Sequence, residues 1–139
     1  MSYKYSICHP DKEEIEYRDN PISATEILNI AKNYPWIEKL EFSNSLDQNK
    51  VYYSPSLEFN CIDDGKSFTL TAGYGDKGEL EFSLWYNRPK KVKILFGVFG
   101  EREKMVVDEA WSFDFDKAIR YLEYFVNKNY QEVEKIYNS

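Results

Sequence analysis

Four apolar runs with a period of two follow one another along the middle of the chain. Such alternation places apolar side chains on one face of a strand and polar side chains on the other. The runs lie within residues 57–61, 68–74, 80–86 and 92–98. The turn sequences between them are Asp63-Asp64-Gly65-Lys66, Gly75-Asp76-Lys77-Gly78 and Asn87-Arg88-Pro89-Lys90. This pattern predicts an antiparallel β meander that is apolar on one face.

Shorter segments with strand-like composition flank the meander. Residues 3–8 and 13–18 alternate in part and are separated by a turn at 9–12, so they predict an opening hairpin. Other short strands are predicted around Leu40 and Phe42, at Val51-Tyr52-Tyr53 and at Met105-Val106-Val107. The sheet is therefore expected to contain about five to seven strands.

An early helix is indicated by its capping residues. Ser23 precedes Glu26 by three residues, which is the spacing of a capping box. Apolar residues then recur at helical spacing up to Pro35, and a proline disfavours helical conformation in the residue before it. We therefore expect a helix over residues 23–33.

The last part of the chain carries one long apolar stripe at helical spacing, preceded by the N-cap candidate Asp114. A break at 127–129 predicts helices over 115–127 and 130–137. An apolar stripe beside a one-sided sheet is typical of a two-layer α+β domain. We expect a single domain over 1–139, in which the N-terminal helix and a C-terminal helix or helix pair cover one face of the meander.

Few residues offer catalytic or metal-binding chemistry. His9 is the only histidine, and Cys8 and Cys61 are the only cysteines, without C-x-x-C spacing. No serine lies in a nucleophile-elbow sequence. The segment G-Y-G-D-K-G at 73–78 matches a dinucleotide-binding pattern, but a strand rather than a helix follows it. We expect no catalytic residue, no bound metal and no cofactor.

The net charge of −6 argues against a nucleic-acid binder, which needs a basic excess to displace counterions. Only residues 88–104 are basic, with six bases and two acids. We interpret that run as the solvated face of a strand. No apolar run approaches the roughly 20 residues of a membrane helix, and the N-terminus lacks the apolar stretch of a secretory signal. These features predict a cytoplasmic protein with free thiols.

The candidate binding residues combine acids with two aromatic side chains. The acids gather near two turns of the meander, and Glu79, Glu81 and Trp85 share the strand face opposite the core. Aromatic side chains often anchor protein interfaces, although the opening hairpin or a loop is equally able to cover Trp85. The candidate partner-binding residues are Asp63, Asp64, Tyr74, Asp76, Glu79, Glu81 and Trp85.

One resemblance adds to this interpretation. The segment 79–86 leads through Ile94-Leu95-Phe96-Gly97 to the apolar stripe at 115–125. Over residues 36–130 this arrangement resembles the immunity proteins that neutralise bacterial polymorphic or contact-dependent toxins. The resemblance is architectural and assigns no binding residue by motif. It implies a non-enzymatic inhibitor, a monomer or weak dimer, that binds a toxin domain such as a nuclease.

Two other functions fit the same sequence. An enzyme or small-molecule binder would hold its ligand in a pocket between the sheet and the helices, with convergent polar groups. A subunit of a larger assembly would use Leu95, Phe99 and Trp85 as an outward apolar patch.

Overall fold

The computed structural model describes residues 2–93 and 101–137, with side chains except those of 89–93 and 101–106. Within these residues the chain forms a six-stranded antiparallel sheet in the order β2-β1-β3-β4-β5-β6. The strands are β1 (Tyr3–Cys8), β2 (Glu16–Ile22), β3 (Ser56–Cys61), β4 (Ser67–Tyr74), β5 (Leu80–Lys93) and β6 (Glu101–Phe113). The predicted α+β class with an antiparallel meander is thereby confirmed.

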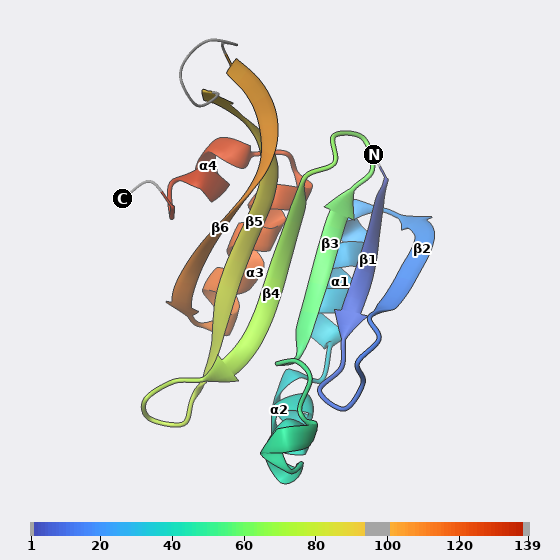
Figure 1. Ribbon diagram of the computed structural model, residues 1–139, viewed down its shortest axis with the longest axis vertical. Helices are drawn as coiled ribbons and strands as arrows, with labels where there is room; N and C mark the ends of the chain where they lie inside the picture. The colour runs from blue at the N-terminus through green and yellow to red at the C-terminus, as the bar shows by residue number, and fades with distance from the viewer. Residues whose placement is uncertain (1, 94–100, 138–139) are drawn as a thin grey trace.

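The helices gather on one face of the sheet and at its ends. They are α1 (Ala24–Asn33), α2 (Trp36–Ser45), the short 3-10 helix η1 (Gln48–Lys50), α3 (Phe115–Val126) and α4 (Tyr130–Glu134). Figure 1 shows α1 and α3 behind the sheet, α2 at one end of it and α4 near the other. The sheet face toward the viewer carries no helix. No helix among those described is long and apolar enough to cross a membrane.

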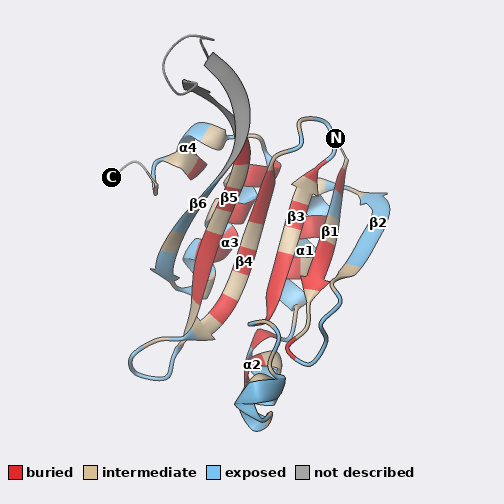
Figure 2. Ribbon diagram, viewed as in Figure 1, coloured by how far each residue is buried: buried red, intermediate tan, exposed pale blue. Residues whose placement is uncertain are grey.

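The core lies between the sheet and the pair α1 and α3. Alternate residues of the strands point into it, which gives the banded burial pattern of Figure 2. Phe59 and Leu84 of the sheet are completely buried, as are Ile27 of α1 and Leu122 of α3. The Tyr3 hydroxyl donates a hydrogen bond of 2.6 Å to the carbonyl of Val126 and so ties β1 to α3.

Both predicted N-caps are confirmed. The Ser23 hydroxyl accepts a hydrogen bond from the Glu26 amide at 3.2 Å, and α1 begins at the next residue. The Asp114 carboxylate accepts from the Lys117 amide at 2.8 Å and starts α3 in the same way. Each cap satisfies a backbone donor that would otherwise lack an intrahelical partner.

The strand predicted around Leu40 and Phe42 is wrong, because this segment belongs to the helix α2. Trp36 and Leu40, four residues apart, are both buried on one face of that helix, whereas Phe42 is exposed. The Trp36 indole N–H donates to the Ala31 carbonyl at 2.9 Å and fixes α2 against α1.

The strand predicted at residues 51–53 is also wrong. This segment is an irregular connection that binds to the opening hairpin. The Tyr52 amide donates to the Pro10 carbonyl at 2.9 Å, and the Tyr53 hydroxyl donates to the Glu13 carbonyl at 2.8 Å. Its backbone groups are therefore partly satisfied by a turn rather than by a neighbouring strand.

The turn predicted at 87–90 is wrong as well, since β5 continues through Pro89 to Lys93. Pairing between β4 and β5 ends at Asn87, so beyond that point β5 has a neighbour only on the β6 side. A proline is tolerated there because one side of the strand needs no donor. The strand predicted over 92–98 lies mostly outside the described residues.

The remaining differences concern boundaries. The second opening strand occupies Glu16–Ile22 rather than 13–18. The strand predicted at residues 105–107 is part of the much longer β6. The last helix covers Tyr130–Glu134 rather than 130–137.

Candidate functional site

The uncovered face of the sheet carries rows of side chains that cross all or most of the strands. One row of successive cross-strand partners consists of Tyr17, Ser6, Glu58, Thr69, Trp85 and Glu109. A second row consists of Cys8, Ser56, Thr71 and Ser83, and a third of Lys4, Asn60, Ser67, Asn87 and Val107. Small hydroxyl side chains thus occupy the middle strands, and large aromatic side chains stand on either side.

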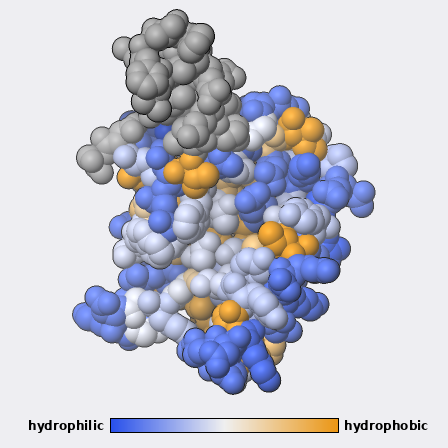
Figure 3. All heavy atoms as spheres, in the orientation of Figure 1, coloured by the Kyte–Doolittle hydropathy of each residue, from blue (hydrophilic) through white to orange (hydrophobic). Residues whose placement is uncertain are grey.

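This difference in side-chain size makes the face concave. Two hollows of about 260 and 310 Å³ lie on it and share Thr71 and Trp85 in their walls. We call the two hollows together the trough. Figure 3 shows side chains of intermediate hydropathy across the middle of this face, with strongly hydrophilic ones along its border.

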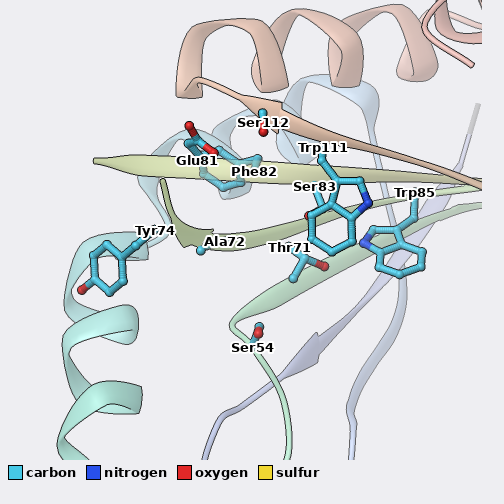
Figure 4. Close-up of a pocket in the computed structure, with 11 residues that line it drawn as sticks. Ser54, Thr71, Ala72, Tyr74, Glu81, Phe82, Ser83, Trp85, Trp111 and Ser112 are labelled. Carbon is cyan, nitrogen blue, oxygen red and sulfur yellow. The ribbon is translucent and has the colours of Figure 1, made fainter. Parts of the chain in front are cut away.

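A pair of tryptophans forms one wall of the trough. The rings of Trp85 on β5 and Trp111 on β6 lie 6.3 Å apart in an edge-to-face arrangement. Trp111 is 66% exposed, which is rare for so large an apolar ring. Figure 4 shows the two rings next to each other, with Ser83 beside Trp111 and Glu81 further along β5.

Trp111 follows Val107 and Glu109 on this face with a period of two, and a bulge in β6 comes directly after it. The register between β5 and β6 shifts between Phe82 and Leu84, where Ser112 adopts a positive φ of 71°. The extra residue lets Phe113 pack against the core while Trp111 faces the trough. A non-glycine residue in this conformation carries backbone strain, and such strain is concentrated at functional sites.

Several polar groups around the trough lack partners. The indole N–H of Trp85 and the side-chain oxygen of Asn87 are buried without a hydrogen bond within the described part of the chain. Ser83 is only 5% exposed and lines the hollow beside Trp111. Buried polar groups are almost always hydrogen-bonded, so the Trp85 and Asn87 atoms call for an explanation.

Five of the seven predicted binding residues lie on or beside the smaller hollow of the trough, the one lined by Trp111. Tyr74, Glu81 and Trp85 line the hollow directly. Asp76 and Glu79 belong to the exposed turn between β4 and β5 that adjoins it. The structure thus places these five residues around one hollow, whereas the sequence grouped the acids of both turns.

The carboxylates of Glu79 and Glu81 meet above Gly75. A Cβ atom on Gly75 would contact oxygens of both side chains, so a larger residue there would displace the two carboxylates. Neither carboxylate has a basic side chain within ion-pair distance among the described residues. Within the described part of the chain, the two negative charges at this end of the trough therefore have no ion-pair partner.

Asp63 and Asp64 lie elsewhere, because successive hairpin turns of a meander fall at opposite ends of the sheet. Asp64 accepts hydrogen bonds from the Tyr130 hydroxyl at 2.6 Å and from the Lys66 amide at 3.0 Å. Burial alone would raise the pKa of Asp64, but these hydrogen bonds outweigh it and lower the pKa. Asp63 pairs with Lys128 at 3.2 Å. Both acids therefore help to attach α4.

Arg88 is not on a solvated strand face, contrary to the prediction for the basic run. It is 7% exposed and lies over the ring of Tyr86. Its guanidinium pairs with Asp108 of β6 at 2.6 Å and with Glu134 of α4 at 3.2 Å. The side chains of Lys90, Lys91 and Lys93 are outside the described set, as are Leu95 and Phe99.

The side chains with catalytic potential, His9 and Cys8, lie in surroundings that give them other roles. His9 contacts the Glu16 carboxylate at 3.0 Å, and this bond and the one from Arg18 lower the pKa of Glu16. Burial, together with the charge of Glu58, raises the pKa of the Cys8 thiol, which disfavours the nucleophilic thiolate. Within residues 2–93 and 101–137, no group of three or more His, Cys, Asp or Glu is placed to hold a metal ion.

Sequence reasoning missed Trp111 and the small hydroxyl side chains that form the floor of the trough. The floor was available from the alternation itself, since Ser56, Thr71 and Ser83 are the polar positions between the apolar ones. Trp111 was missed because the strand predicted at 105–107 ended before it, whereas β6 extends to Phe113. No protein-family model, curated protein or solved structure matches this chain.

Proposed function

We propose that the protein is an immunity protein, which binds a bacterial toxin domain through the trough and blocks it without catalysis. The observation that carries the proposal is the uncovered sheet face with its tryptophan pair, of which Trp111 is exposed and Trp85 half-buried. The architectural resemblance described above supplies the class of partner.

The composition of the trough suits a protein partner. Exposed faces of antiparallel sheets are usually polar, yet Tyr17, Val107 and Trp111 on this face are each more than half exposed. Aromatic side chains flanking a concave surface are typical of interface centres, where they fill complementary pockets. The low floor of serines and threonines leaves space for a projecting segment of the partner.

The charge of the chain favours a basic partner. The net charge is −6, and Glu58, Glu81 and Glu109 lie on the trough face. Complementary charge accelerates association and selects among partners. A toxin domain with a basic cleft, as nucleases require to hold phosphates, fits this surface.

A small-molecule function is the second candidate, supported by a separate hollow. This hollow of about 240 Å³ lies where the α1–α2 connection meets β5 and α3, lined by Tyr34, Trp36, Leu80 and Phe115 among others. The Tyr34 hydroxyl is buried without a partner among the described residues. A ligand bound there would perturb Trp36 rather than Trp85 or Trp111, which discriminates the two candidates.

A growth-rescue experiment tests the main proposal. Genomic fragments from the organism that encodes the chain are expressed from an inducible promoter, and those that arrest growth are co-expressed with the chain. We expect one fragment to be neutralised by the wild-type chain and by Tyr52→Ala, which alters an exposed aromatic residue outside the sheet. The double variant Trp85→Ala/Trp111→Ala is expected to lose the rescue.

Two results would contradict the proposal. One is a set of growth-arresting fragments of which none is neutralised by the wild-type chain. The other is a fragment neutralised equally well by the wild type and by the folded double variant.

A further inference from the structure

We infer that the hollow beside Trp111 receives an arginine side chain of the bound protein. This inference rests on the proposed function and specifies the chemistry of the same surface. The hollow, of about 260 Å³, is hereafter the Trp111 hollow. The residues that line it include Tyr74, Glu81, Ser83, Trp85, Trp111 and Ser112.

Two aromatic rings, those of Trp85 and Trp111, stand at one end of the Trp111 hollow. Tyr74 lies at the other end, with its ring directed away from them. The edge-to-face arrangement of the two indoles leaves much of the Trp111 ring accessible, consistent with its 66% exposure. An accessible indole face attracts a cation through its quadrupole, and arginine is the cation most often found there.

Two carboxylates without a described basic partner lie next to the Trp111 hollow. The carboxylates of Glu79 and Glu81 lie close to each other above Gly75, and no described basic side chain pairs with either. Two carboxylates at close range repel each other, so a cation placed between them and Trp111 would relieve that repulsion. Lys77 of the same turn is exposed and makes no ion pair with them.

The hollow also offers uncharged hydrogen-bonding groups. Ser83 is 95% buried and lines the hollow, and its hydroxyl oxygen can accept a hydrogen bond from a guanidinium. The indole N–H of Trp85 can only donate, so an acceptor of the partner other than the guanidinium would have to satisfy it. A hydroxyl acceptor next to a space of this size suits a donor side chain of the partner.

Arginine fits this combination better than lysine or a neutral side chain does. Its planar guanidinium can stack on Trp111 and donate in parallel to a carboxylate, whereas the lysine ammonium is a compact, strongly hydrated charge. A neutral amide would gain neither the attraction to the ring nor that to Glu81.

The test is a titration with small probes, followed through the indole N–H signals in ¹H–¹⁵N NMR spectra. The chain has three tryptophans, and Trp36 serves as an internal control because its N–H is bonded to Ala31 within the core. The probes are acetylated and amidated Gly-Arg-Gly, Gly-Lys-Gly and Gly-citrulline-Gly peptides. Citrulline has the shape of arginine without its charge.

We expect the arginine peptide to shift the Trp111 and Trp85 signals saturably and to leave Trp36 unchanged. The citrulline peptide should cause no saturable shift, and the lysine peptide should bind more weakly. Glu81→Gln should weaken arginine binding about fivefold, while Glu123→Gln on the opposite face should bind as the wild type does.

Absence of a saturable shift, equal binding of citrulline or lysine, or unchanged binding by Glu81→Gln would each overturn the inference. The experiment is independent of the growth rescue. A toxin neutralised by a chain that does not bind the arginine peptide would refute only the arginine site. Arginine binding without any neutralised fragment would refute only the toxin partner.

Discussion

At the scale of single residues, the two faces of the sheet differ mainly in side-chain size. Phe59, Phe68 and Leu84 fill the space toward the helices, whereas Ser56, Thr71 and Ser83 leave the other side hollow. A period of two fixes both sets at once, so the same alternation that builds the core also builds the floor of the trough.

The hydrogen bond between Tyr130 and Asp64 gives a prediction at this scale. Because the pKa of Asp64 is lower in the folded state than its unfolded value of about 4, the ionised carboxylate stabilises the fold above that pH. This stabilisation is lost as the pH falls through the folded-state pKa. We expect Asp64→Asn to lower the free energy of unfolding by about 1 kcal/mol at neutral pH.

Urea unfolding of the wild type and Asp64→Asn over a series of pH values checks this prediction. The difference between them should shrink as the solution becomes more acidic. A difference that stays constant with pH would show that the carboxylate charge plays no part.

The bulge at Ser112 gives a second prediction. A β-branched residue is strongly disfavoured at positive φ, so Ser112→Val should lower the free energy of unfolding by about 1–2 kcal/mol. Ser112→Gly should be neutral or slightly stabilising, because glycine adopts this conformation without a steric penalty. Thermal unfolding of both variants measures the contrast, and equal stabilities of the two would argue against the bulge.

At the scale of elements, the sequence predicted structure best where the determining interactions are local. The caps at Ser23 and Asp114 located α1 and α3 because each satisfies local backbone donors. The helix α2 was missed because two alternating apolar residues, Leu40 and Phe42, imitate a strand, and only packing shows that Trp36 pairs with Leu40. Likewise, the local turn signal at Pro89 was outweighed by pairing between β5 and β6.

The candidate site shows the same limit. Glu81 and Trp85 were predictable because they alternate on one strand. The partnership of Trp85 with Trp111 was not, since it depends on the register between β5 and β6. The separation of Asp64 from Glu81 follows from meander geometry, which places successive turns at opposite ends.

Attachment of α4 to the sheet gives a third prediction. Arg88 links β5, β6 and α4 through Asp108 and Glu134, and its side chain is 8% exposed. Arg88→Met keeps most of the side-chain volume but leaves the two carboxylates without a counter-charge. It should lower the free energy of unfolding by about 1–2 kcal/mol and accelerate amide exchange in α4.

Lys135→Met is the matched control for Arg88→Met. Its ion pair with Glu132 lies on the surface of the same segment, so its removal should not change stability measurably. Hydrogen exchange compared across the two variants would contradict the assignment if α4 were destabilised equally by both.

At the scale of the whole molecule, shape and charge point to the same surface. Helices cover one face of the sheet, and the other face is concave, aromatic at its sides and acidic at one end. The net charge of −6 adds a long-range electrostatic attraction between the protein and basic partners.

This charge predicts that association is salt-dependent. The association rate constant of the chain with the domain it neutralises should fall about tenfold between roughly 50 mM and 500 mM salt. Glu79→Lys/Glu81→Lys should slow association at low salt and flatten this dependence. Stopped-flow kinetics measure both, and a rate constant indifferent to ionic strength would contradict the electrostatic part of the account.

The central claim is that the trough is the binding surface, and the dissociation constant of Trp111→Ala tests it most directly. Isothermal titration of the neutralised domain with wild type, Trp111→Ala and the control Tyr52→Ala compares two exposed aromatic residues on different surfaces. The account predicts that Trp111→Ala weakens binding about thirtyfold or more, as expected for a central anchor, while Tyr52→Ala binds like the wild type. Unchanged affinity for a folded Trp111→Ala, or a loss confined to Tyr52→Ala, would contradict it.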